Sequence, residues 1–131
     1  MAATPLFSHM LDPEIDRTFA RLCVDVEHAL LPGLVNDVEQ HVAQAREALA
    51  VNEFLDVAMA DKVASLLVGL INKIGKYPQE KQKLIVGAAR YFIRNHDAQD
   101  DMRSLLGFDD DVAVLNYVLT ELGHADMRIQ L

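Results

Sequence analysis

Apolar residues recur at intervals of three and four along most of this chain, and no window shows the sustained alternation typical of a half-buried strand. Glycine and proline are few, and they fall between the apolar runs, where helices are expected to end. This spacing predicts an all-α protein that folds as one compact, single-domain bundle of about five helices. A chain of 131 residues is long enough to bury a core without disulfides.

The predicted helices are placed by their caps and breakers. Asp12 is a good N-cap and Pro13 fits the first helical position, whereas Pro32 and Gly33 are expected to break the chain. Gly75 is expected to end a later helix in a left-handed conformation. The expected helices cover residues 13–31, 34–50, 52–74, 78–95 and 110–122, with a short turn over 102–106 that Gly107 ends, and Gly123 stops the fifth helix.

Burial can also be predicted from the spacing. The helix over 110–122 is apolar nearly all round, so we expect it near the centre of the bundle. Ala29 and Leu30 continue the apolar face of the first helix, and residues 1–11 and 124–131 are expected to be flexible termini. Cys23 is predicted to be a small buried hydrophobe rather than a nucleophile, and His28 and His41 to lie on helix surfaces.

Charge is divided into three blocks along a chain whose net charge is −8. Residues 1–61 carry a net −8, residues 62–94 a net +6 and residues 95–131 a net −6. One interpretation is that folding pairs these blocks. The other is that part of the basic block stays exposed as an anion-contact surface, for nucleic acid or acidic lipid, although the overall acidity argues against that. That surface would consist of Lys73, Lys76, Lys81, Lys83, Arg90 and Arg94.

A stripe at helical spacing lies within this basic block. Lys83, Gly87, Arg90 and Arg94 share one face of the helix predicted over 78–95, and three of the four are cationic. Such a stripe is typical of a solvated helix face, and it also fits a small anion-binding ridge.

Six aspartates crowd the segment from Arg94 to Asp111. Asp109 and Asp110 precede the fifth helix, where a carboxylate accepts hydrogen bonds from unpaired backbone N–H groups. Asp100 and Asp101 can do the same for the short turn after them. Helix capping therefore accounts for most of these carboxylates without a ligand.

The alternative is a divalent-cation site, or a metal-dependent enzyme, in the same segment. Its ligands would be Asp97, Asp101, Asp110 and Asp111, with His96 nearby, but their spacing does not match a calcium-binding helix–loop–helix. We therefore expect no cofactor, with a divalent cation as the alternative.

The stretch from Tyr91 to Leu115 resembles the signature of the YkvA-like bacterial domain of unknown function. That family has prolines where this chain has Asn95, Asp100 and Ser104, and an apolar connection where this one is polar. The resemblance implies a helical hairpin whose connection is fixed by aspartates. Because that connection is polar in this chain, it argues against membrane contact. The matching residues are Tyr91, Ile93, Asp97, Asp101, Leu106, Gly107, Asp110, Asp111, Ala113, Val114 and Leu115.

No catalytic constellation is recognisable in the sequence, and no apolar run is long enough to cross a bilayer. The lone cysteine and the absence of a signal-peptide pattern favour a reducing cytoplasm. The leading hypothesis is therefore a non-enzymatic module of a bacterial cytoplasm that binds another protein, or a second copy of itself, as an adaptor, regulator or inhibitor.

Overall fold

The computed structural model describes residues 13–49, 57–94 and 109–129, and within these ranges it contains helices and no strand. The predicted all-α fold is therefore confirmed. The helices predicted over 34–50, 78–95 and 110–122 are found with their ends shifted by at most three residues. The elements are α1 (Pro13–Leu22), η2 (His28–Leu30), α2 (Leu31–Leu49), α3 (Val57–Asn72), η3 (Ile74–Lys76), α4 (Gln79–Arg94), α5 (Asp109–Glu121) and η6 (Ala125–Met127), where η denotes a 3₁₀ turn.

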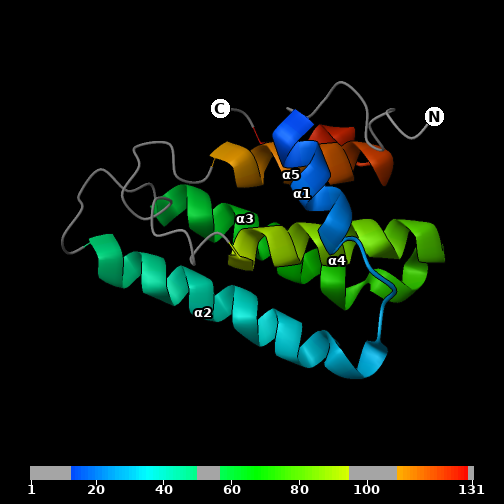
Figure 1. The fold of residues 1–131 in the computed structure, drawn as a ribbon. Coiled ribbons are helices and arrows are strands. Elements are labelled where there is room, and N and C mark those ends of the chain that lie inside the picture. The colour runs from blue at the N-terminus through cyan, green and yellow to red at the C-terminus, as the bar shows by residue number, and fades with distance from the viewer. Residues whose placement is uncertain (1–12, 50–56, 95–108, 130–131) are drawn as a thin grey trace.

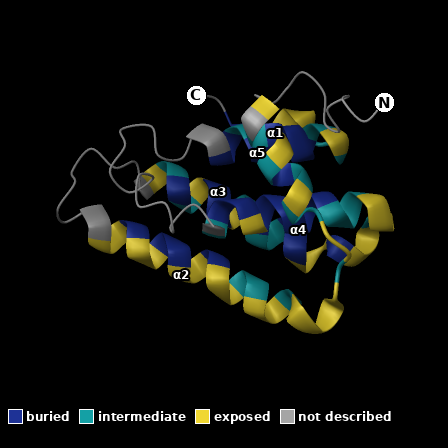
Figure 2. Ribbon diagram, viewed as in Figure 1, coloured by how far each residue is buried: buried dark blue, intermediate teal, exposed yellow. Residues whose placement is uncertain are grey.

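Helix α4 is the centre of the bundle, since it contacts each of the other four α-helices. Figure 1 shows α2 and α5 on opposite sides of α4, with α1 crossing next to α5. Residues 84–89 are all buried because neighbours cover most of this part of α4. The sequence predicts the central position for α5 instead. That helix is buried around most of its surface, as Figure 2 shows, but it lies at one side of the bundle.

Every α-helix contributes large side chains to the core. The outer faces of the helices are exposed, and Figure 2 shows them in yellow. Phe19 of α1 meets the ring of Tyr117 of α5 edge-on, with ring centroids 6.3 Å apart. Edge-to-face aromatic pairs of this kind add to the stabilisation from burial alone. The described residues thus form one continuous core that joins α1, α4 and α5 to the α2–α3 pair.

The first helix ends nine residues earlier than the sequence predicts. Helix α1 stops at Leu22, and the chain continues without helix to η2, where Glu27 has an extended conformation (φ −108°, ψ 106°). Pro32 does not break the chain. It lies in the first turn of α2, where a missing backbone N–H is no loss. Consequently Ala29 and Leu30, predicted to face the core, are exposed.

The glycines that end helices behave differently from one another. Gly123 has a φ of 85° and ends α5 as predicted. The backbone N–H of His124 donates to the Leu119 carbonyl (2.8 Å) and that of Gly123 to Thr120 (3.2 Å), which are the two bonds of a Schellman motif. Gly75 does not have a positive φ, so that prediction is wrong. The chain after α3 tightens instead into the 3₁₀ turn η3, where the backbone N–H groups of Lys76 and Tyr77 donate to the carbonyls of Lys73 (2.9 Å) and Ile74 (3.1 Å).

The segment after α5 packs against the bundle through residue 129, and the flexibility predicted for residues 124–131 stays a prediction. Asn116 of α5 clamps Ile129: its Nδ2 donates to the Ile129 carbonyl (2.9 Å) and its Oδ1 accepts from the Ile129 N–H (2.8 Å). Tyr77 and His124 share a hydrogen bond of 2.8 Å, and Ile129 is buried. Residues 1–11, predicted to be the other flexible end, lie outside the described ranges.

Across residues 13–49, 57–94 and 109–129, none of the helices combines the length and the apolarity that a bilayer crossing requires.

Candidate docking groove

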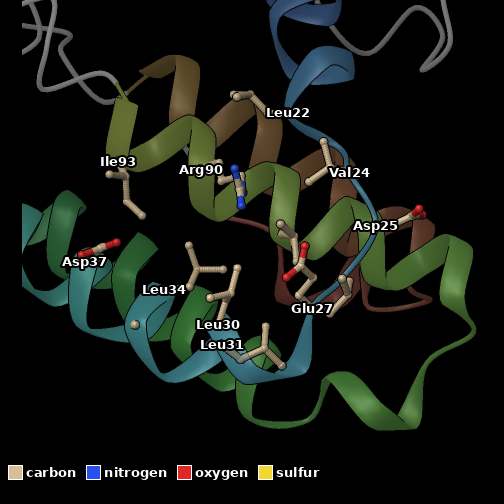
Figure 3. Close-up of a pocket in the computed structure, with 13 residues that line it drawn as sticks. Leu22, Val24, Asp25, Glu27, Leu30, Leu31, Leu34, Asp37, Arg90 and Ile93 are labelled. Atoms are coloured by element: carbon tan, nitrogen blue, oxygen red, sulfur yellow. The ribbon is translucent and has the colours of Figure 1, made fainter.

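An open groove with a volume of about 770 Å³ runs along one side of α4 (Figure 3). Its walls are the non-helical segment 23–27, the start of α2 and the outer face of α4. Most of its lining is aliphatic. The lining residues are Leu22, Val24, Asp25, Val26, Glu27, Leu30, Leu31, Gly33, Leu34, Asp37, Val86, Arg90 and Ile93.

The groove exists because α1 ends early. A helix continued through residues 23–30 would not leave the extended wall that the chain forms between α1 and α2. Val24 and Val26 help to explain the stop, since β-branched side chains lose conformational freedom in a helix. The chain instead crosses α4 in an extended form, so that apolar side chains face each other across a gap.

Contact with Gly87 fixes where this crossing begins. A Cβ atom at Gly87 would collide with the Sγ of Cys23 and lie 2.9 Å from Cε1 of Phe19. The absence of a side chain therefore lets the end of α1 rest directly on α4. One turn earlier on α4, Lys83 forms an ion pair with Asp25 at 3.1 Å and attaches the extended segment a second time.

The wall of the groove exposes apolar surface to solvent. Leu30 is 56% exposed and Val24 is 39% exposed. In the described part of the chain only Met127, at the C-terminal turn η6, joins them among the exposed large hydrophobic residues. Two of these three residues therefore line one groove, and covering them would be favourable by about 25 cal/mol for each Å² of apolar surface removed from water.

One cation and three carboxylates lie around this apolar surface. Figure 3 shows the guanidinium of Arg90 directed from α4 toward the groove. Asp25 is held by Lys83, whereas no described side chain of opposite charge lies within ion-pair distance of Arg90, Glu27 or Asp37. Three charged groups are therefore available to a molecule that enters the groove.

Cys23 packs beside the groove and is not a candidate nucleophile. Burial raises its pKa to about 12, the charge of Asp16 acts in the same direction, and Lys83 opposes both. The thiol is therefore protonated at neutral pH, when a thiolate would be needed for nucleophilic chemistry. The side chain lies against the core but is half-buried, whereas the sequence predicts a buried hydrophobe.

Three buried polar side chains were not recognised from the sequence. His41 was predicted to lie on a helix surface, but it is 2% exposed and its ring meets Phe92 edge-on at 4.6 Å. It occupies the apolar stripe of α2, three residues after Val38, so the spacing contained the signal. Asp16 and Asp111 are also buried, and no sequence signal distinguished them from surface acids. His28 is exposed, as predicted.

Most of the aspartate-rich segment, residues 95–108, lies outside the residues that the structure describes. Helix α5 begins at Asp109, one residue earlier than predicted, and nothing is described of the Asp109 and Asp110 side chains, so their capping role stays a prediction. In the described residues no group of three or more metal-binding side chains comes together. Asp12, Asp97, Asp100, Asp101 and Gly107, with His96, fall in undescribed ranges, so their capping and metal-binding roles stay predictions.

The basic block is distributed over several sides of the molecule. Lys81 pairs with Glu121 of α5 (3.4 Å) and Lys83 with Asp25, which confirms pairing between the basic and acidic blocks at these two sites. Lys73 and Lys76 are exposed around η3. Arg90 lies in the groove, and the Arg94 side chain is outside the description.

Comparison with known family models, with curated proteins and with solved structures finds no match for this chain. The resemblance to the YkvA-like domain therefore stays a prediction from the residues between Tyr91 and Leu115.

Proposed function

We propose that this chain is a non-enzymatic interaction module that docks an amphipathic helix of a partner protein in the groove beside α4. The observation that supports the proposal is the exposure of Leu30 and Val24 on the wall of a 770 Å³ groove. A large apolar concavity with a few charged groups is the usual form of a binding site in a folded domain.

The dimensions of the groove favour a helix as its occupant. Leu31 and Asp37 are six residues apart on α2, which corresponds to about 9 Å along the helix axis. Val86 and Ile93 define a similar length on α4. That space accepts about two turns of a helix, whose apolar side chains at three- and four-residue spacing would meet Leu30, Leu34 and Ile93.

The biological setting belongs to the same proposal. The single cysteine is typical of a reducing bacterial cytoplasm, and the resemblance to the YkvA-like domain agrees with a bacterial source. There the module would act as an adaptor, a regulator or an inhibitor, since docking a helix requires no chemical step. A second copy of the chain is one form that the partner could take.

A display library of designed helices tests the proposal. Each member is about 16 residues long and carries a fixed leucine stripe with polar positions varied among Lys, Glu and Gln. The full chain should enrich a set of these helices. Leu30→Glu should weaken their binding about tenfold or more, because it places a charge on the apolar wall.

Met127→Glu is the matched control. Met127 is 41% exposed and does not line the groove, so the same substitution there should leave binding unchanged. If no helix is enriched, or if the two variants weaken binding equally, the groove is not a helix-docking site.

A further inference from the structure

The charges around the groove follow an order along its length. Glu27 lies where the extended segment meets η2. Asp37 lies more than one turn after the start of α2, toward the Ile93 end of the groove. Arg90 projects from α4 on the facing wall, and Figure 3 shows it between the two acids. The groove therefore presents a carboxylate toward each end and a guanidinium between them.

Among the described residues, no carboxylate lies within ion-pair distance of the Arg90 guanidinium. The described acids of the groove are Asp25, which pairs with Lys83, and Glu27 and Asp37, which are not within ion-pair distance of Arg90. An apolar helix lying over Arg90 would remove water from a cation without replacing its hydrogen bonds, which is strongly unfavourable. An occupant with a carboxylate at that position restores them, and a guanidinium can bind it through two parallel hydrogen bonds.

Glu27 and Asp37 favour the opposite charge. Both are exposed, as Arg90 is, but they lie toward the ends of the groove, where a docked helix covers them less than it covers Arg90 (Figure 3). Exposed charges of this kind act mainly by steering an oppositely charged partner and by disfavouring a like-charged one. Basic residues toward the ends of a docked helix would therefore be preferred, with a smaller effect on affinity than the central carboxylate.

We infer that the groove selects its partner by charge order: Arg90 binds an acidic residue near the middle of the docked helix, and Glu27 and Asp37 face basic residues toward its ends. The inference rests on the proposed function, and it adds the chemistry of the partner and the residue that recognises it. Arg90 is then the specificity-determining residue, whereas Leu30 and Leu34 supply apolar contact that is indifferent to charge.

Selection from the same helix library tests this order. Helices enriched by the full chain should carry Glu at the central position and Lys toward both ends. Arg90→Glu should change the central preference from Glu to Lys and leave the preference at the ends unaltered. Between two helices that differ only in the central residue, the affinity ratio should be about tenfold toward Glu for the unaltered chain and reversed for Arg90→Glu.

Lys62→Glu is the matched control, because it changes the net charge equally at an exposed position of α3 outside the groove. It should leave the central preference at Glu. If helices are enriched and depend on Leu30, but their central residue is random or unchanged by Arg90→Glu, the charge order is wrong and the docking function stands.

If no Leu30-dependent helix is enriched, the docking function itself is wrong. Titration with decanoate separates one further case. Chemical-shift changes in the groove that depend on Arg90, from decanoate and not from any helix, would assign the groove to a small apolar acid and would overturn both proposals.

Discussion

On one face of α4, Ile85, Ala89 and Phe92 are buried in the core, whereas the opposite face carries Lys83, Gly87 and Arg90 at the same spacing. The first face is covered by whole helices. The second is covered by the end of α1 at Gly87 and by the following segment near Lys83, and it is left open at Arg90. The contrast shows how one helix can support a core and a binding surface, provided that the helix packed on its outer face ends before it covers that face completely.

The comparison predicts its largest effect on the packed face. Phe92→Ala should lower the free energy of unfolding by about 3–5 kcal/mol, because it removes a fully buried ring that also contacts His41. Leu30→Ala, on the open side, should change it by less than about 0.5 kcal/mol. Urea denaturation followed by circular dichroism measures both. Similar losses for the two variants would mean that the groove wall is part of the core.

The sequence predicted the packed face better than the open one. Helical spacing predicts that Leu84, Ile85, Ala88, Tyr91 and Phe92 face inward, and all five are buried, although Val86, Gly87 and Ala89 are buried as well. The stripe of Lys83, Gly87, Arg90 and Arg94 contains one residue of the groove, Arg90. Spacing within one helix is a local property, so it can be recognised without knowing what covers that helix.

The end of α1 could not be predicted in the same way. Val26 and Leu30 fit a helical stripe with Leu22, so periodicity alone continues the helix. The stop depends on contacts made across the fold, by Cys23 with Gly87 and by Asp25 with Lys83. Pro32 contained a usable signal, since proline is common in the first turn of a helix and could have marked the start of α2.

Gly87→Ala should have the next largest effect, since Gly87 lies where the open face is closed by the end of α1. The added methyl group would collide with Cys23 and Phe19, and overpacking of this kind costs about 1–3 kcal/mol. Alanine is the better helix former by about 1 kcal/mol, so the collision must exceed that gain.

Gly69→Ala supplies the matched control, because a Cβ atom at Gly69 of α3 meets nothing within 4 Å. That variant should be stabilised by up to about 1 kcal/mol in the same urea titration. If Gly87→Ala is also stabilised, α1 does not rest on α4 as closely as the structure shows.

A further expected effect appears at alkaline pH and concerns the ionisation of Cys23, at the start of the extended segment, and of Tyr117. The pKa of Cys23 is raised to about 12 and that of Tyr117 also to about 12, in both cases mainly by burial. Between about pH 9 and pH 12 the unfolded chain therefore releases protons that the folded chain still holds, so the free energy of unfolding falls as the pH rises through this window. The urea midpoint should be lower near pH 10.5 than near pH 8.

Cys23→Ala separates the thiol from the phenol. The variant keeps Tyr117 and every lysine, so it should lose part of the pH dependence and retain the rest. Because the thiolate would form beside Asp16 and against Gly87, ionisation of Cys23 should act on the segment that forms the groove wall rather than on the α4–α5 contact. If both proteins show the same pH dependence, the loss of stability at alkaline pH comes from groups other than Cys23. The groove wall would then be held independently of the thiol.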